Sequence, residues 1–486
     1  MTNSTDNGTE SADDQPARTP PPAQPNYDNA FDAIVVGAGL AGSAAAITMA
    51  NEDLDVLMIE RGAYPGAKNV FGGVMYTPTI RDLVGMDGAP IERYVGQRRY
   101  AMLTEEDEVS ASMNIGDWHE EPHNDSFTVL RGEFDEWFAE QAVEAGATLI
   151  TETTVTDLIR ENGYIVGVKT DRPDGDVRAP IVVLAEGGNS LVSEGADLKA
   201  APDRKDVAVA VKEVVEFPGD SDEIIEDRFR LGDEDGAAYH YFGEGAAGKS
   251  FGGGFIYTND DTVSVGLAYR IEDSISQGIN PEKRLNEFKS HPAVAPLFKD
   301  ARTVEYTAKT IPEGGADAMP DLVHDGALLV GDTAGLVLNN GVHLEGTNMA
   351  VESGYHAGKA VVEAFNSIPA TERTAGAASG AATARADGGM VIPSSHLQSY
   401  PDRLEESFVV KNLEHYEWLI HRVTEDKELL FEELPEALAD AAAEYFAIDR
   451  QPKQVHGERA KERVLGTLGG LRGLVKLGWR YRKLVR

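Results

Sequence analysis

A glycine-rich stretch near the amino terminus constrains this chain more than any other feature. Residues 33–36 are apolar and mostly β-branched, as in a buried strand, and the small residues of 43–50 favour a helix. Gly37, Gly39 and Gly42 therefore lie on a strand-to-helix turn. In such a turn the first glycine permits the bend, the second lets a pyrophosphate approach the backbone, and the third lets the helix pack on the strand. The stretch predicts a bound dinucleotide.

An acidic residue at the end of the next predicted strand supports the prediction of a bound dinucleotide. Glu60 closes a second apolar strand, residues 56–59, where its carboxylate can accept hydrogen bonds from a ribose hydroxyl. A glycine-rich turn without a ligand is the alternative, but the strand, the helix and the acid together favour a dinucleotide. The candidate cofactor contacts in this region are Gly37, Ala38, Gly39, Gly42, Glu60, Arg61 and Lys68.

A later segment indicates which dinucleotide is bound. The apolar run at 327–330 ends in Gly331 and Asp332, which places a carboxylate at the carboxyl edge of a parallel sheet, where such sheets bind ligands. The residues that follow it predict a helix whose amino end would stabilise the negative charge of a reduced flavin. The candidate contacts at this helix start are Gly346, Thr347 and Asn348.

Three further pieces carry a resemblance to a known fold. They are residues 130–142, a predicted strand at 151–155, and the run at 181–190. In this order they resemble the FAD-binding set of the glutathione-reductase-like flavoproteins that include p-hydroxybenzoate hydroxylase and geranylgeranyl reductase. The resemblance implies Asp332 at the ribitol, Arg131 near the phosphate and ribose, and Val155 among the FAD contacts.

The fold class that follows is α/β. We expect a doubly wound, glutathione-reductase-like FAD-binding domain with an inserted, mostly antiparallel β domain for the substrate or quinone, and a helical carboxyl-terminal region. The predicted parts are a disordered acidic tail (1–29), a discontinuous FAD domain (30–199 and 316–365), the β domain (200–315), a flexible insertion (366–395), a helical region (396–450) and a basic amphipathic tail (451–486).

Four blocks narrow the resemblance. Residues 60–73, 251–257, 290–297 and 311–315 look like the electron-transfer-flavoprotein:quinone oxidoreductases, and within them the FixC branch. The resemblance covers residues 30 to about 450. In that family a glycine pair that matches Gly252 and Gly253 lies at the quinone head group, where bare backbone lets a planar ring approach. A bulge or tight bend in the sheet is the alternative explanation for this pair.

The chain contains no cysteine. Larger members of the family carry an iron–sulfur module held by cysteine thiolates, and this chain cannot ligate such a cluster. The FixC branch works with a small, separate ferredoxin-like subunit. The resemblance therefore implies an electron-transfer flavoprotein, a ferredoxin-like iron–sulfur subunit and a quinone as partners. Disulfides and thiol redox chemistry are excluded, and the compartment is left open.

The charge balance predicts an unusual environment. With 82 acidic and 44 basic residues, the formal net charge is −38. Such self-repulsion favours solubility where salt is molar and the Debye length is about 3 Å, so we expect a halophile's cytoplasm. A surface of this sign argues against nucleic acid as a ligand.

The sign of the charge reverses at the carboxyl terminus. From residue 453 to 486 there are ten bases and two acids, and on a helical wheel the bases lie opposite Leu471, Leu474 and Leu477. This pattern is typical of a helix on a membrane surface, which would make the protein peripheral on the cytoplasmic face. A helix that packs on the acidic body or on a subunit is an equal alternative. No apolar run of roughly 18 residues predicts a membrane span.

The expected function is that of an FAD-dependent oxidoreductase of the FixC type. Electron transfer from a flavin to a quinone needs no protein nucleophile and no metal, so neither is predicted. His343 follows the Gly-Asp segment and could face the flavin, although loop histidines are more often solvated. The alternatives are a geranylgeranyl reductase acting on archaeal isoprenoid lipids and a non-catalytic flavoprotein scaffold. The former usually has an aromatic-Pro pair where this chain has residues 255–258.

Overall fold

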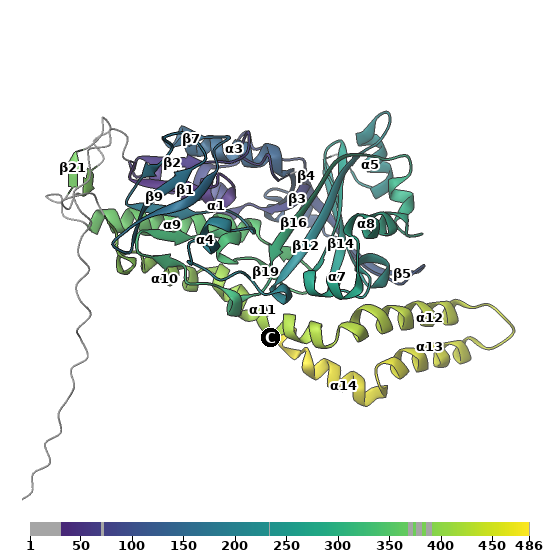
Figure 1. Cartoon of the computed structure of the whole chain (residues 1–486). Coiled ribbons are helices and arrows are strands. Elements are labelled where there is room, and N and C mark those ends of the chain that lie inside the picture. Colours follow the sequence, from purple (N-terminus) through teal and green to yellow (C-terminus); the bar gives the residue numbers. More distant parts are fainter. Residues whose placement is uncertain are drawn as a thin grey trace, which may run out of the picture.

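The structure of the chain is a computed structural model that describes residues 31–69, 72–232, 234–367, 373–375, 382–384 and 391–485. Two α/β bodies lie side by side and a helical arm runs beneath them (Figure 1). The tail predicted at 1–29 and most of the insertion predicted at 366–395 lie outside the described residues. The predicted fold class is confirmed, with a parallel sheet, a large antiparallel sheet and carboxyl-terminal helices.

The first body contains a mainly parallel sheet with the strand order β17-β18-β11-β1-β2-β7. Its inner strands are short and fully buried because they consist of valine, isoleucine, leucine, methionine and alanine, which suits a sheet covered on both faces. The strands are β1 (Ala33–Val36), β2 (Val56–Ile59), β7 (Thr148–Ile150), β11 (Ile181–Leu184), β17 (Val323–His324) and β18 (Ala327–Leu329).

Helices α1 (Leu40–Ala50) and α9 (Thr347–Ser367) pack closely together in this body. All of α1 is buried, and its small side chains let α9 approach. At Gly354 of α9, a Cβ atom would lie 2.0 Å from the carbonyl oxygen of Ala41, so only glycine fits there. The remaining helices of this body are α2 (Pro78–Val84), α3 (Arg131–Glu144) and α4 (Leu191–Gly195).

A small antiparallel sheet lies between β7 and β11 in the sequence. Its strands are β8 (Val155–Glu161), β9 (Tyr164–Thr170) and β10 (Val177–Arg178). The strand predicted at 151–155 is therefore wrong, since β7 ends at Ile150 and β8 begins at Val155. The intervening residues turn, with Glu152 in the left-handed region at φ 50°. Threonine-rich sequence favoured a strand there, but the chain must reverse between two sheets.

The second body is a large, mostly antiparallel sheet with the order β16-β12-β15-β14-β13-β4-β6-β3 and with β5 paired to β4. Its strands are β3 (Gly72–Tyr76), β4 (Arg93–Leu103), β5 (Glu108–Asn114), β6 (Ser126–Leu130), β12 (Val207–Glu216), β13 (Asp235–Phe242), β14 (Gly252–Thr258), β15 (Thr262–Arg270) and β16 (Arg302–Pro312). Two further short strands, β19 (Leu338–Asn339) and β20 (Leu344–Glu345), pair with each other.

This sheet differs from the predicted boundaries of the β domain. Strands β3 to β6, from residues 72–130, belong to it, although the sequence assigned them to the FAD domain. The reason is that β4 pairs in parallel with β13, which is more than 130 residues away. The local sequence pattern cannot identify so distant a partner. The strands of the second body therefore come from two segments of the chain, 72–130 and 207–312.

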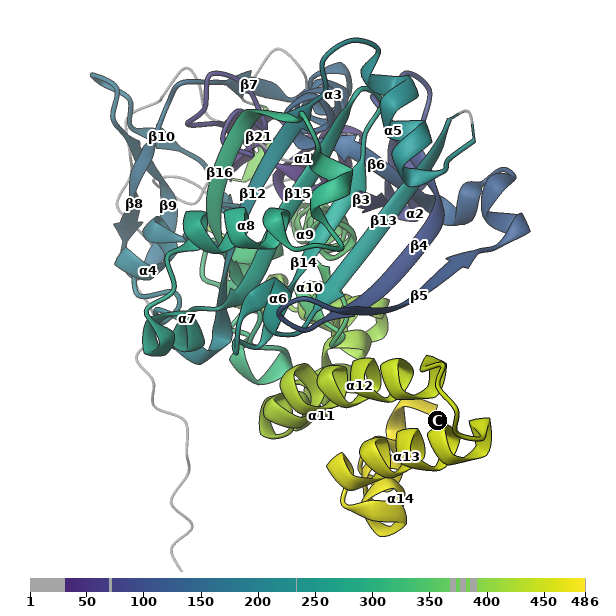
Figure 2. The ribbon, with the colours of Figure 1, turned by 90° about the vertical axis from the view of Figure 1, so that its right-hand side faces the viewer.

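The two faces of the large sheet have different roles. One face packs under α5 (Ser221–Phe229), α6 (Glu244–Ala247), α7 (Ile271–Gln277) and α8 (Pro281–Ser290), as the quarter-turn view shows (Figure 2). On β13, Tyr239 and Tyr241 belong to the core beneath these helices. Because strand side chains alternate, His240 and Phe242 point to the opposite face, toward the first body.

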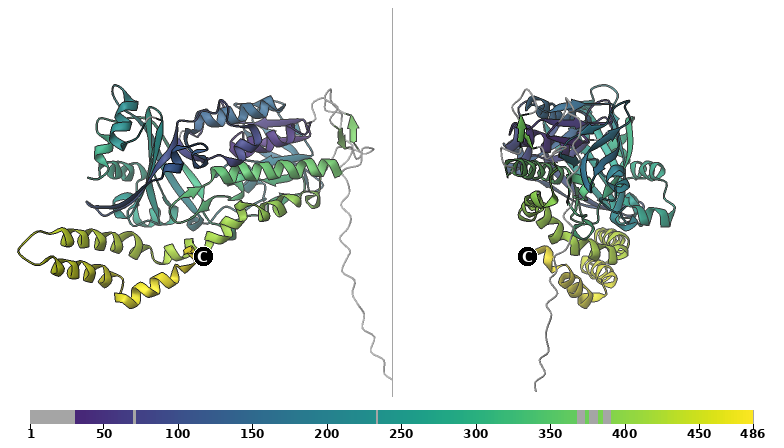
Figure 3. Two further views of the ribbon diagram at one scale, coloured as in Figure 1. Left: turned by 180° about the vertical axis from the view of Figure 1, so that it is seen from behind. Right: turned by 60° about the vertical axis from the view of Figure 1, so that its left-hand side comes forward.

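The carboxyl-terminal region is helical, as predicted. Helix α11 (Phe408–Glu425) leads to an antiparallel pair, α12 (Leu434–Phe446) and α13 (Lys453–Thr467), that extends past the large sheet (Figure 3). Helix α10 (Ser399–Glu406) precedes them and α14 (Gly470–Arg480) returns toward α11. The basic tail is broken at Gly469 and Gly470, both in the left-handed region. No helix in the described ranges is long and apolar enough to cross a membrane.

Candidate functional site

Each of the three glycines in the turn after β1 is required for a different structural reason. Gly37 has φ 99°, and a Cβ there would lie 2.3 Å from the carbonyl oxygen of Ala185. At Gly42, a Cβ would lie 2.0 Å from the carbonyl oxygen of Gly37. Around Gly39 a Cβ would meet nothing within 4 Å in the described part, because this residue borders a cavity. The first and third glycines therefore allow packing, and the second leaves space for a ligand.

Glu60 holds this turn in place. Its carboxylate accepts a hydrogen bond from the backbone N–H of Ala38 at 3.1 Å and another from Gly62 at 2.6 Å. Glu60 also borders the cavity, as a partner for a ribose hydroxyl must. The cofactor contacts predicted nearby, Arg61, Lys68 and Val155, line the same space.

A single cavity of about 480 Å³ lies between the two bodies. Most of the predicted contacts line it: Gly37, Gly39, Glu60, Arg61, Lys68, Arg131, Val155, Asp332, Gly346, Thr347, Gly252 and Gly253. Ala38, Gly42, Gly331 and Asn348 lie one layer behind. At Gly331 a Cβ would lie 2.9 Å from that of Ala41, and the Asn348 amide donates to Glu345 at 3.4 Å. Predicted contacts that lie far apart in the sequence therefore line one cavity.

The first turn of α9 borders this cavity through Gly346, Thr347 and Ala350. The amino end of a 21-residue helix carries a partial positive charge and unpaired N–H groups. The amino end of α9 would therefore stabilise the negative charge of a reduced flavin.

Asp332 lies deep in the site with cations around it. Burial raises the pKa of Asp332, and the nearby charges of Arg131, Lys309 and Lys212 oppose that rise. Arg131 is itself fixed by Asp135, with Nε–Oδ1 at 2.7 Å and Nη2–Oδ2 at 2.9 Å. Such a two-point bond fixes the guanidinium plane, as recognition of a phosphate requires.

Sequence reasoning missed two lysines of this cluster. Lys212 and Lys309 lie on the face of the large sheet that lines the cavity. Burial, followed by the charge of Arg131, lowers the pKa of Lys309 to about 8. Burial, followed by the charge of Lys309, lowers the pKa of Lys212 well below its usual range. Cations crowded together in this way favour an anionic ligand such as a pyrophosphate.

A signal for Lys212 was present in the sequence. It interrupts the alternation of β12, where Val207, Val209 and Val211 occupy one face and small alanines precede Lys212 on the other. A lysine among alanines on a buried strand face indicates a ligand or a counter-ion. Lys309 carries no comparable signal, because β16 is an edge strand of mixed polarity.

The glycine pair Gly252 and Gly253 lies on β14 at the far end of the cavity, near Phe242, Phe251 and Phe431. Close packing also requires these glycines, since a Cβ at Gly252 would lie 2.2 Å from the Ala268 carbonyl oxygen. The pairing of β14 with β15 is regular here, so the pair does not form a bulge. Both glycines line the cavity beside aromatic rings, where a flat, apolar ligand could approach.

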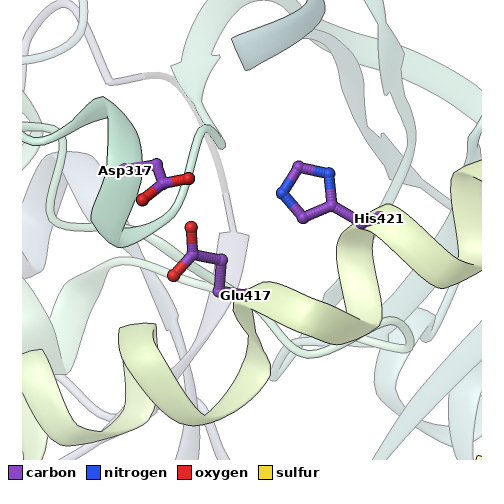
Figure 4. A group of neighbouring side chains, drawn as sticks. All are labelled: Asp317, Glu417 and His421. Carbon is purple, nitrogen blue, oxygen red and sulfur yellow. The ribbon is translucent and has the colours of Figure 1, made fainter.

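A second group of polar side chains lies outside the cavity. Asp317 of the short helix η5 (Ala316–Ala318) faces Glu417 and His421 of α11, with their ligand-type atoms within 4.8 Å of one another (Figure 4). Burial and the Asp317 carboxylate both raise the pKa of Glu417. Asp317 and His421 are exposed, and the expectation that the protein needs no metal stays a prediction.

Comparisons with known proteins agree with this architecture. Residues 32–201 match the family described as FAD dependent oxidoreductase, residues 223–311 match "ETF-QO, ubiquinone-binding", and residues 420–486 match the ETF-QO/FixC family C-terminal domain. ETF-QO stands for electron-transfer flavoprotein–quinone oxidoreductase. Protein FixC of Bradyrhizobium diazoefficiens is 37% identical over 459 residues, which are 94% of this chain and 99% of the relative. This chain belongs to the ETF-QO/FixC family.

Another relative in the family is the probable electron transfer flavoprotein-quinone oxidoreductase YdiS of Escherichia coli. It is 38% identical over 433 residues, 88% of this chain and 93% of its own length. Among solved structures, a geranylgeranyl bacteriochlorophyll reductase-like protein from Thermoplasma acidophilum has a TM-score of 0.63 at 19% identity, covering 94% of this chain and 98% of the other. The flavin-dependent brominase Bmp2 has a TM-score of 0.56 at 15% identity, covering 89% and 99%. These two likenesses show the fold.

The protein is an FAD-dependent oxidoreductase, and the residues present fit this cofactor. The open backbone at Gly39 and the carboxylate of Glu60 suit its adenosine half, and the cations around Arg131 suit its pyrophosphate. Asp332 and the first turn of α9 line the same cavity and would suit the ribityl chain and the ring. Bound FAD supplies the electron-transfer chemistry, and this chain binds and orients it.

Proposed function

We propose that this chain accepts electrons from an electron-transfer flavoprotein and passes them through FAD to a membrane quinone. One observation carries the proposal. Gly39 and Asp332, which are typical of an FAD site, line the same cavity as Gly252 and Gly253. A flavin and a flat acceptor bound in this cavity would therefore lie close together, as electron transfer between them requires.

Two further findings support this function. Residues 223–311, which contain the glycine pair, match the ubiquinone-binding family, and a relative of similar length carries the name of an electron transfer flavoprotein-quinone oxidoreductase. The apolar rings of Phe242, Phe251 and Phe431 suit an isoprenoid-bearing ring better than a charged substrate.

The test uses the purified chain loaded with FAD, a reduced electron-transfer flavoprotein and a short-chain quinone. We expect the quinone absorbance to fall only when all three are present. An unsaturated isoprenoid lipid serves in a parallel reaction, because saturation of its double bonds would instead support a geranylgeranyl reductase. Unchanged electron flow without FAD would support a scaffold. Absence of quinone reduction with reduced donor flavoproteins would refute the proposal.

An iron–sulfur subunit forms the second part of the proposal. The 486 residues contain no cysteine, so the thiolates of an iron–sulfur cluster would come from a separate ferredoxin-like chain. We expect co-expression with such a subunit to yield a complex that contains iron and that transfers electrons faster than the single chain. A chain that reaches full turnover with the donor flavoprotein alone would contradict this part.

Membrane association at the cytoplasmic face forms the third part. On α14 the exposed fractions of Leu471, Val475 and Trp479 are 66%, 71% and 65%. At the end of the tail, Arg480 and Tyr481 instead bind Asp426 of the helical region, at 2.7 and 3.0 Å. The carboxyl end of α14 is therefore docked on the helical region, while these three side chains form an exposed apolar stripe along the helix.

Vesicle flotation tests this third part. We expect Val475→Asn to reduce binding of the full chain to anionic vesicles at molar salt, where charge attraction is screened. Val143→Asn is the matched control, because Val143 is also exposed but lies on α3 of the first body. Equal binding of both variants and the wild type would contradict the proposal.

A further inference from the structure

A buried histidine faces the cavity with an open hydrogen-bonding position. His240 of β13 is 7% exposed and lines the cavity. Its Nε2 atom is buried and has no hydrogen-bond partner within the described part of the chain. Leaving a buried polar atom unpaired costs free energy, so such an atom in a ligand cavity indicates a group that the ligand satisfies.

His240 lies close to the glycine pair. The pairing of β13 with β14 places Phe255 opposite His240 and Gly254 opposite Tyr241. A Cβ at Gly253 would lie 3.2 Å from the ring of Phe242, which shares the cavity face with His240. Gly253 is thus two residue pairs along the sheet from His240, on the diagonal, a separation of roughly 7–8 Å.

Polar side chains lie between His240 and the edge of the cavity, and His343 directs its two ring nitrogens at Tyr100 and Glu345 rather than at His240. The His343 ring lies 4.4 Å from the His240 ring, measured between centroids, and Tyr100 stacks on His240 at 5.3 Å. The Tyr100 hydroxyl hydrogen-bonds to His343 Nε2 at 2.8 Å. On the other side of His343, its Nδ1 lies 3.9 Å from the Glu345 carboxylate. The loop beside it is open to solvent at Val342.

Burial and the neighbouring charges favour the neutral form of His240. Burial, followed by the charges of His343 and Arg98, lowers the pKa of His240 well below its ordinary value. Burial likewise lowers the pKa of His343 to about 4, with Arg98 contributing. The other titratable groups on the packed elements are Tyr76 of β3, Arg98 and Tyr100 of β4, Tyr257 of β14 and Glu345 of β20. A neutral imidazole can donate one N–H and accept at its other nitrogen, as a proton relay requires.

We propose that His240 Nε2 hydrogen-bonds a carbonyl oxygen of the quinone and that His240, His343, Tyr100 and Glu345 bring one of its two protons from solvent. The inference rests on the proposed quinone reduction. Converting a quinone to a quinol adds two electrons, which the reduced cofactor supplies, and two protons, which form two O–H bonds. The proton that leaves His240 is replaced through a water molecule on the side of His343, and His343, Tyr100 and Glu345 pass a solvent proton to that water, so the relay ends each turnover unchanged.

Two substitutions at His240 separate binding from proton transfer. His240→Phe removes both, and we expect affinity for a redox-inactive quinone analogue to fall about three- to tenfold and kcat about a hundredfold. His240→Gln retains an N–H donor, so the analogue should bind within about threefold of wild type while kcat falls at least tenfold and the solvent isotope effect on kcat rises. Analogue binding is measured from the flavin absorbance of the loaded protein.

The matched control is His291→Gln. His291 is also buried in the second body, where its Nε2 donates to the Thr104 carbonyl, but it does not line the cavity. If the wild type reduces quinone and both His240 variants match it in kcat and analogue affinity, the relay is refuted while the proposed function stands. If the wild type neither binds the analogue nor reduces quinone, the proposed function itself fails. Retained FAD content shows that each variant is folded.

Discussion

Arg131 and Asp135 form a two-point ion pair in which the carboxylate is completely shielded from solvent. Asp135 also accepts a hydrogen bond from the Asn69 amide at 2.7 Å. Removing Arg131 alone would leave a buried charge without its partner, and this costs about 3–5 kcal/mol in the free energy of unfolding. We expect Arg131→Met to be destabilised by that amount and to lose FAD, as measured by denaturation and by flavin content.

A double variant distinguishes the two roles of Arg131. In Arg131→Met combined with Asp135→Asn, neither charge remains, so most of the lost stability should return. FAD affinity should stay low, because the cation beside the cofactor phosphate is still missing. Recovery of FAD affinity together with stability would show that Arg131 acts only on the fold.

We expect Lys309 to make the stability of the FAD-free protein depend on pH. Its pKa is lowered from 10.5 to about 8 by burial and neighbouring cations, so the folded chain holds this proton less tightly than the unfolded chain does. Between about pH 8 and 10.5 the unfolded state binds more protons, and the stability of the FAD-free protein should rise with pH. Lys309→Met should reduce this rise, with Lys212 accounting for part of what remains, as followed by denaturant titration at several pH values.

Binding of FAD should show the opposite trend. A pyrophosphate favours charged Lys309 and raises its pKa, so FAD affinity should fall as the pH rises above about 8. At pH 7 we expect Lys309→Met to weaken FAD binding about tenfold, which corresponds to about 1.4 kcal/mol. An FAD affinity that does not change from pH 7 to 9.5 would place Lys309 away from the phosphates.

The parts of the fold that follow from sequence are those with local causes. β1 and β2 are continuous apolar runs, and α1 is a run of small residues, so their positions agree with the prediction to within a few residues. The assignment of β3 to β6 to the first body failed because alternation predicts a strand but not its partner. The pairing of β4 with β13 depends on the assembled sheet.

The same distinction applies to the site. Gly39, Glu60 and Asp332 are recognisable because the turn and strand ends that position them are encoded within a few residues. Lys309 and His240 come from strands of the second body, and they reach the cavity only because one face of that sheet turns toward the first body. The helices packed on one face of the large sheet leave the other face toward the first body, and the local sequence does not predict which face that is.

Glu313 titrates near neutral pH and lines the cavity. Burial raises its pKa to about 7, against the opposing effects of Arg270 at 3.3 Å and the Asn339 amide at 3.0 Å. Between pH 4.5 and 7 the unfolded state binds fewer protons, so the wild type should lose stability as the pH rises through this window. Glu313→Gln keeps one of these two hydrogen bonds, because its amide oxygen accepts and its amide nitrogen only donates, and it should reduce the loss of stability with pH. If the stability of the wild type and of Glu313→Gln changed with pH in the same way, Glu313 would not be a buried carboxyl that is protonated in the folded state.

A smaller change in stability is expected from substitution of Glu417, which lies beside Asp317 outside the cavity (Figure 4). Its pKa is raised by burial and by the Asp317 carboxylate, so at neutral pH the two acids repel each other. Glu417→Gln should therefore stabilise the protein by a few tenths of a kcal/mol at low salt, and the gain should shrink in 1 M KCl. Melting temperatures at both salt concentrations measure this difference, and destabilisation at pH 7 would contradict it.

Two glycine-to-alanine changes in helices should have opposite signs. Gly354→Ala places a Cβ 2.0 Å from the Ala41 carbonyl oxygen, so α9 must move away from α1 at a cost of about 3 kcal/mol. FAD content should fall with it, because the amino ends of these two helices carry Gly39 and Thr347. Gly457→Ala in α13 meets only Tyr445 at 3.8 Å and should stabilise by about 0.5–1 kcal/mol through helix propensity. Equal destabilisation of both would mean that backbone entropy, rather than the contact of α9 with α1, decides the outcome at Gly354.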